Sequence, residues 1–146
     1  MKKSQRLGPV IKVAKNREEN AAKALNESRH ILEKNEAKLA ELLAYQQEYT
    51  KQYEDVGRGG TEIHRINEFR QFLTKLNQAI SNQREIIKAK QSELDKKNDI
   101  WLQTRIKHKS IDKIATRHRT DERRNEDRRE QAESDDRSQH IKTSKD

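Results

Sequence analysis

The sequence predicts an all-α protein in which two long helices form an antiparallel coiled-coil hairpin, followed by a disordered, charged C-terminal tail. Three observations predict this fold class. Of the 146 residues, 40% are charged and 29% are hydrophobic, which is too little apolar material to enclose a broad globular core. The single proline and the four glycines fall in two places only, whereas sheet folds need turn residues after every strand. A hydrophobic heptad repeat runs along most of the chain.

The first helix is expected to begin near Pro9, after a basic N-terminal arm at residues 1–8. Proline is tolerated in the first turn of a helix, where its missing N–H has no partner to lose. Alternating steps of four and three residues from Leu7 define fifteen seam positions, of which eleven are apolar. These positions are Leu7, Ile11, Ala14, Glu18, Ala21, Leu25, Ser28, Leu32, Asn35, Leu39, Leu42, Gln46, Tyr49, Tyr53 and Val56.

A turn is predicted at residues 57–60, where three of the four residues are glycine. Glycine takes the positive φ that ends many helices, and Thr61 has the side chain to cap the start of the next helix. The same stepping then continues along the second helix, with a weaker apolar pattern after Ile87. Its seam positions are Ile66, Phe69, Leu73, Leu76, Ile80, Gln83, Ile87, Lys90, Leu94, Lys97, Trp101, Thr104, His108, Ile111 and Ala115.

Two long helices joined by a short turn pack as antiparallel neighbours, which places the hairpin at residues 9–115. Pairing residue by residue around the turn puts Val56 near Thr61 and Leu7 near Lys109 and Ile111. Residues 116–146 then form a charged tail that is either a frayed helix or disordered. From residue 117 onward the tail has nine basic and nine acidic side chains and almost no apolar ones, so nothing in it can be buried.

The sequence contains no apolar run long enough for a transmembrane helix or a signal peptide, and no cysteine for a disulfide or a thiolate metal site. We therefore expect a cytoplasmic protein that is stabilised by helix packing. No phosphate-binding loop motif is present, and the five histidines lack the spacing of metal ligands. Acidic residues occur as adjacent pairs, which point apart on a helix and cannot share a proton. We expect no enzyme activity, no cofactor and no metal.

The clearest candidate for a binding site is an aromatic cluster near the turn. Five of the six aromatic residues lie there, although coiled-coil seams favour aliphatic side chains. Tyr49 and Tyr53 fall on the seam, whereas Tyr45 and Phe72 fall beside it. These two residues, with Ala79, indicate a second apolar strip of the kind that anchors protein partners.

The charge distribution predicts a rod with one positive end. Residues 1–16 carry five basic and no acidic side chains, and residues 84–113 carry nine basic and five acidic ones. The hairpin brings these segments together at the end away from the turn. Such an end suits a partner different from that of the aromatic cluster.

The chain resembles the flagellar FliJ family of export proteins. The resemblance rests on the run Leu39 to Tyr49, which contains Tyr-Gln-Gln-Glu-Tyr, and on the run Ile66 to Leu73, which contains Phe-Arg-Gln-Phe. The Leu7-Gly8-Pro9-Val10 start and Trp101 are similar to the family as well. The likeness covers roughly residues 5 to 115.

The resemblance implies a soluble part of the flagellar type III export apparatus, similar to the central stalk of rotary ATPases and peripherally associated with the inner membrane. Three partners are implied, namely the hexameric export ATPase, the cytoplasmic domain of the export gate, and export chaperones. Residues implied for gate binding are Leu42, Tyr45, Tyr49, Phe72, Leu76, Ala79 and Gln83. The expected contacts with the ATPase ring are Lys12, Lys15, Arg105 and Lys109, by the hypothesis that the positive end enters the pore.

Three alternatives stay open at this point. An injectisome stalk protein belongs to the same export class and differs little in sequence pattern. A basic coiled-coil arm that binds nucleic acid would fit the pI of about 9.7, although acidic residues interrupt its basic segment. A homodimeric coiled-coil scaffold would show the same heptads.

Overall fold

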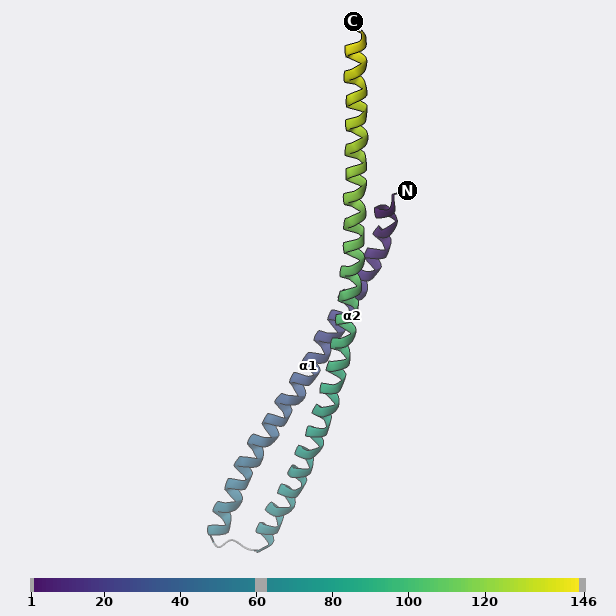
Figure 1. Cartoon of the computed structure of the whole chain (residues 1–146). Helices are drawn as coiled ribbons and strands as arrows, with labels where there is room; N and C mark the ends of the chain where they lie inside the picture. Colours follow the sequence, from purple (N-terminus) through teal and green to yellow (C-terminus); the bar gives the residue numbers. More distant parts are fainter. Residues whose placement is uncertain (1, 60–62, 145–146) are drawn as a thin grey trace. The chain divides into compact units, whose positions relative to one another are not determined.

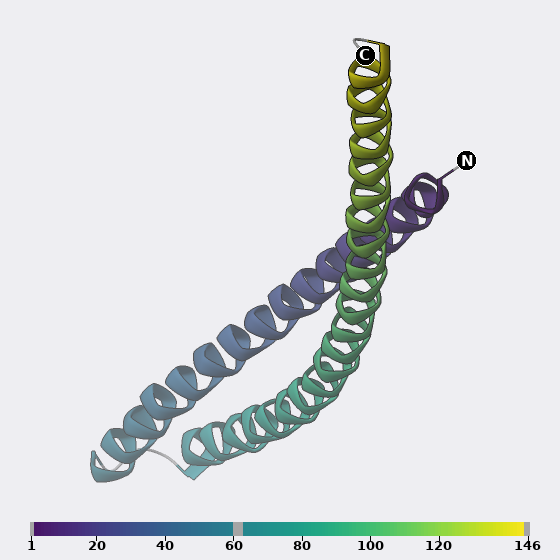
Figure 2. The same cartoon turned by 45° about the horizontal axis from the view of Figure 1, so that its top comes forward.

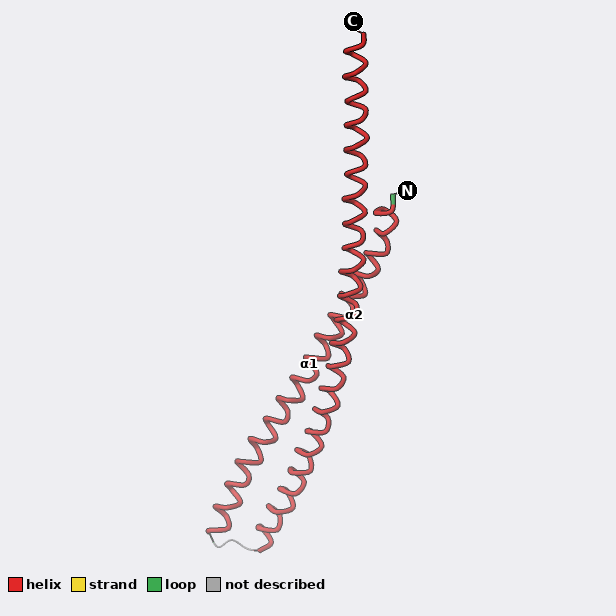
Figure 3. The backbone as a smooth tube through the Cα atoms, in the orientation of Figure 1, coloured by secondary structure: helices red, strands yellow, loops and turns green. Residues whose placement is uncertain are grey.

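The computed structural model describes residues 2–59 and 63–144, and within these ranges it contains two α-helices and no strand (Figure 3). Helix α1 spans Lys3–Arg58 and helix α2 spans Ile63–Ser144. The two helices pack against each other as an antiparallel hairpin, so the predicted fold class is confirmed. The chain divides into two compact units that each contain part of both helices. Unit 1 consists of Met1–Asn20 with Trp101–Asp146, and unit 2 consists of Ala21–Ile100.

In unit 2 the two helices lie side by side (Figure 1). Leu25, Leu32, Leu76 and Ile80 are its most buried apolar side chains. All four occupy predicted seam positions. Full burial of a leucine or isoleucine side chain contributes about 1.5–3 kcal/mol, so each of these residues contributes substantially to the packing of this unit.

In unit 1 the N-terminal turns of α1 lie across α2 (Figure 2). Ala14 and Ala115 are its buried apolar residues, and Ala115 is fully buried. Small side chains at these seam positions let the two helices approach closely. Residues 123–142 of α2 are all exposed to solvent.

The predicted seam is the seam of the structure. All predicted seam positions lie within the described residues, and each of them except Lys97 is buried or half-buried. A lysine at a seam position can run its methylene groups along the apolar surface and keep its ammonium group in water. The weaker half of the second arm therefore still packs in the predicted register.

The start of the first helix was predicted too late. Helix α1 begins at Lys3, and Pro9 lies inside it. The proline removes only the hydrogen bond that its own N–H would make to the carbonyl of Gln5, an exposed residue whose carbonyl water can satisfy. The preceding residue, Gly8, has no Cβ to clash with the proline ring.

The turn begins later than predicted. Gly57 and Arg58 are still helical, and the chain turns at Gly59, whose N–H donates to the carbonyls of Asp55 and Val56, each at 3.2 Å. A glycine at this position is typical of a helix C-terminus. The predicted roles of Gly60 and Thr61 lie outside the described residues.

The predicted pairing in unit 1 was also wrong. Leu7 lies beside Ile114 and His118, which are about one and two helical turns beyond the expected Lys109 and Ile111. The side chain of Ser4 reaches Glu122. Counting residues evenly around the turn ignores those needed to cross between helices that pack about 8–10 Å apart, so the second helix was placed out of step.

Helix α2 continues through Ser144, although a boundary near residue 115 and a frayed or disordered tail were expected. Extending an existing helix costs far less than nucleating one. The segment contains no glycine or proline and is rich in Arg and Glu, which favour helix. No helix within the described ranges has a stretch that is long and apolar enough to cross a membrane.

Candidate functional site

The aromatic residues of unit 2 form one connected cluster around Tyr49. The ring of Tyr49 lies 4.3 Å from that of Phe72 and 4.9 Å from that of Phe69, centroid to centroid. Tyr45 meets the edge of Phe72 at 5.8 Å and stacks on Tyr49 at 5.9 Å. Contacts at these distances contribute about 0.5–1.5 kcal/mol each beyond the area that they bury. The cluster therefore fixes both helices near the turn.

The exposed part of this cluster consists of Tyr45 and Phe72. Tyr45 is 47% exposed and Phe72 is also exposed, whereas Tyr49, Tyr53 and Phe69 are half-buried. The sequence placed Tyr49 and Tyr53 on the seam and the other two beside it, and the burial agrees. Two neighbouring aromatic rings at the surface form a suitable anchor for a protein partner.

The other residues expected at the gate-binding surface lie deeper. Leu42 and Ala79 are half-buried, whereas Leu76 and Gln83 are buried in the seam. In the heptad register Tyr45, Phe72 and Ala79 occupy position g on one side of the seam, and Leu42 and Tyr49 occupy the adjoining d positions. Leu76 is part of the buried seam between the helices, and Gln83 contacts Asn35 of the opposite helix.

Polar contacts across the seam of unit 2 are made by neutral amides. Gln83 Nε2 donates to both the carbonyl and the Oδ1 of Asn35, and Gln46 Nε2 donates to Asn77 Oδ1. Ser28 is also buried in this seam. Polar seam residues of this kind select one register, because any other register leaves them without partners.

The residues expected at the ATPase ring lie in unit 1. Lys12, Lys15, Arg105 and Lys109 are all exposed. With Ile11 and Ala14 taken as heptad positions a and d, Lys15 occupies position e and Lys12 position b. With Trp101 and Thr104 as a and d, Arg105 and Lys109 occupy e and b. All four therefore share one side of the seam, and the guanidinium carbon of Arg105 lies 5.3 Å from the ring centroid of Trp101.

Polar contacts across unit 1 involve charged groups. Glu18 Oε2 and His108 Nδ1 lie 2.5 Å apart in a half-buried part of the seam. At the start of α1, the Ser4 hydroxyl donates to Glu122 at 2.6 Å, and Lys2 pairs with Glu126. The Ser4 hydrogen bond lowers the pKa of Glu122, and the hydrogen bond and charge of Lys2 lower the pKa of Glu126. The hydrogen bond to Glu126 and the charge of Glu126 raise the pKa of Lys2.

Sequence reasoning missed these terminal contacts and an apolar groove nearby. Extending the stepping by one position before Leu7 and two beyond Ala115 would have reached Ser4, His118 and Glu122, all half-buried. The groove, of about 300 Å³, lies in unit 1 on the side of the seam away from Lys15. The sequence feature that could have indicated this groove is the pair of apolar residues Val10 and Val13, which lie next to the seam positions.

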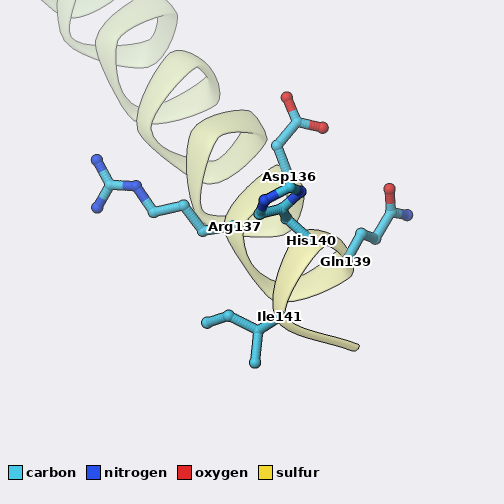
Figure 4. A pocket seen from close by; sticks show the side chains of 5 residues that line it. All are labelled: Asp136, Arg137, Gln139, His140 and Ile141. Atoms are coloured by element: carbon cyan, nitrogen blue, oxygen red, sulfur yellow. The ribbon is translucent and has the colours of Figure 1, made fainter. Parts of the chain in front are cut away.

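The described residues offer little for small-molecule chemistry. A hollow of about 710 Å³ borders Asp136, Arg137, Gln139, His140 and Ile141, but these side chains leave one helix in different directions (Figure 4). Such an arrangement encloses nothing. No group of three or more His, Cys, Asp or Glu side chains within the described ranges could hold a metal ion.

Comparison with known proteins identifies the family. No curated protein and no solved structure matches the chain significantly. The family model described as "Flagellar FliJ protein" matches residues 2–144, which is nearly the whole chain. The match includes both the aromatic surface of unit 2 and the basic side of unit 1. The chain belongs to the flagellar FliJ family.

Proposed function

We propose that this protein is the coiled-coil stalk of the flagellar export apparatus, which inserts into the hexameric export ATPase and activates it. Membership of the FliJ family makes the protein a component of the flagellar export apparatus, and it favours this system over an injectisome. The proposed role is non-enzymatic and depends on contacts with other proteins. It places the protein in the cytoplasm, peripherally at the inner membrane.

The observation that carries the proposal is that each of the two units has an exposed surface of a different chemistry. The exposed aromatic pair, Tyr45 and Phe72, belongs to unit 2, and the exposed basic residues belong to unit 1. An apolar aromatic surface and a cationic surface suit different partners. We assign the aromatic surface to the cytoplasmic domain of the export gate and the basic side to the ATPase ring.

The export chaperones are the third proposed partner class. Their assignment follows from the resemblance to the family, and no residue is allotted to them. The contact-based role also fits a hairpin whose seam contains several polar residues, since these lower its stability in isolation.

The test is ATP hydrolysis by the export ATPase of the same organism, titrated with this protein and with a Tyr45→Ala/Phe72→Ala variant. The proposal expects both proteins to stimulate hydrolysis to the same extent. Binding of each to the purified gate domain is measured in parallel, and only the variant should lose it. Absence of stimulation together with absence of co-elution with the ATPase would refute the stalk role.

A further inference from the structure

The apolar groove of unit 1 extends over several helical turns. Its first part is lined by Val10 and Val13 of α1 and by Ile111 of α2. A second hollow of about 250 Å³ continues along the same side, where Leu7 of α1 and Ile114 of α2 line it. Val10, Val13 and Ile114 are each about half exposed. The groove thus presents apolar side chains from both helices to solvent.

The heptad register explains why the groove lies on one side only. Val10 and Ile114 occupy position g of their helices, next to the seam. In an antiparallel pair the g positions of the two helices flank the seam on the same side, and the e positions flank it on the other. Charged residues normally occupy position g, so apolar residues there widen the hydrophobic face beyond what two helices can cover.

The charges along the groove all have the same sign. Among the described residues that line it, the charged side chains are Lys3 and Arg6 at one end and Arg17 and Lys107 at the other. Two acidic seam residues of the unit are engaged with other partners, since Glu18 contacts His108 and Glu122 accepts from Ser4. An apolar floor with basic ends favours an occupant that is apolar along one face and acidic at its flanks.

We propose that this groove binds an amphipathic helix of a partner protein, with its apolar stripe against the floor and its carboxylates against the basic ends. The groove follows α1 from Lys3 to Arg17, a rise of about 21 Å, which an occupant helix of about 15 residues would match. Apolar residues three and four positions apart on that helix would meet the floor side chains of both helices. The occupant would complete a three-helix arrangement in this unit.

A second copy of this chain is a poorer occupant than an acidic helix. A symmetric contact through this groove would place each basic end against the basic residues of the other copy. Like charges opposed in this way cost free energy and select against the contact. The proposal is also independent of the ATPase contact, because Lys15 and Arg105 occupy e positions on the other side of the seam.

The test measures binding of a fluorescein-labelled synthetic helix by anisotropy. The probe has about 15 residues, with leucines spaced three and four apart, glutamates at both ends and alanines elsewhere. One control peptide has the same composition in scrambled order, and another has lysine in place of each glutamate. The full chain should bind the acidic amphipathic probe at least tenfold more tightly than either control. Equal binding of all three peptides would overturn the proposal.

Two pairs of variants locate the site. Val10→Ser/Val13→Ser should weaken probe binding at least tenfold, whereas Val13→Ile should retain it. Arg17→Glu/Lys107→Glu should weaken binding more than Lys15→Glu/Lys109→Glu, which changes the net charge equally on the other side of the seam. Equal loss in these two charge variants would show non-specific attraction and refute the groove. A molar mass twice that of the monomer, lost in Val10→Ser/Val13→Ser, would make a second copy the occupant and refute the assignment to a partner.

Discussion

Gln83 of α2 donates two hydrogen bonds to Asn35 of α1, one to its carbonyl and one to its Oδ1, each at 3.0 Å. Gln83 is 3% exposed, so this amide is buried between the helices of unit 2. The contact joins residues 48 positions apart in the sequence. A buried amide with a partner only in this alignment acts as a register mark, because sliding either helix by one turn would leave it unpaired.

Replacing Gln83 by alanine should destabilise the hairpin by about 1–3 kcal/mol, because the change removes both hydrogen bonds and leaves Asn35 without this partner. Thermal unfolding followed by circular dichroism measures the effect. Gln71→Ala serves as the matched control, since Gln71 is exposed on the same helix. A change equal to that of the control would mean that the buried amide contributes nothing to register or stability.

Leu76 and Tyr45 should respond oppositely in folding and binding assays. Leu76 is 6% exposed, so Leu76→Ala should cost about 2–3 kcal/mol of stability, at the lower end of the core range because the seam has only two helices. Tyr45→Ala should cost less, about 1 kcal/mol, because Tyr45 is 47% exposed and its two ring contacts, at 5.8 and 5.9 Å, contribute near the lower end of the range for aromatic pairs. In our proposal Tyr45→Ala nevertheless loses more gate binding than Leu76→Ala at a temperature where both are folded. The reverse order would move the binding surface away from the aromatic pair.

The seam could be predicted from the sequence because its signal is local and repeated many times. Each heptad independently indicates the same register, so the pattern was recognisable despite polar seam residues such as Ser28 and Gln83. The alignment of the two helices was not predictable in the same way. It depends on where α1 ends and how many residues connect the helices, and both quantities are set by a few residues around Gly59. A small error at the turn shifts every pair in unit 1.

The candidate surfaces were predictable to different degrees for the same reason. Tyr45 and Phe72 stand out by residue type, so their position beside the seam could be deduced. Val10 and Ile114 are ordinary core-type residues, and only the three-dimensional pairing reveals that their side chains border one groove. The contact between Ser4 and Glu122 depends on the alignment that sequence counting missed.

Charge reversal on the basic side of unit 1 should weaken ATPase stimulation more than gate binding. Replacing Lys12, Lys15, Arg105 and Lys109 by glutamate alters exposed side chains only, so the helices should remain folded. The loss should shrink as salt rises from low concentration to about 0.15 M, where the Debye length is about 8 Å. Hydrolysis and gate binding are measured on the same protein preparation. An equal loss of both activities would contradict separate surfaces.

The N-terminal contact should open in acid. Ser4 and Lys2 lower the pKa of Glu122 and Glu126 in the folded state, so their stabilisation is present above the ordinary glutamate pKa of 4.5 and is lost as pH falls through the lowered values. The raised pKa of Lys2 means that its contribution is lost only at strongly alkaline pH, as pH rises through that value. Nitroxide labels on Gln5→Cys and Arg123→Cys would report the opening, since the chain has no other cysteine. The distance distribution should broaden below pH 4.5, and Glu122→Ala/Glu126→Ala, which removes both acceptors, should be broad already at neutral pH.

Removing residues 128–146 should leave the unfolding of the hairpin nearly unchanged. Residues 128–142 are all exposed, so their removal uncovers no packed surface. The contacts of Ser4 with Glu122 and of Lys2 with Glu126 remain in the shortened chain. The midpoint of thermal unfolding should therefore shift by no more than about 2 °C, which corresponds to well under 1 kcal/mol for a protein of this size. Truncation after residue 121 also removes both glutamates and should loosen the first turns of α1, which hydrogen exchange would detect. If the shorter deletion lowered the midpoint as much as the longer one, the exposed end of α2 would have to pack on the hairpin.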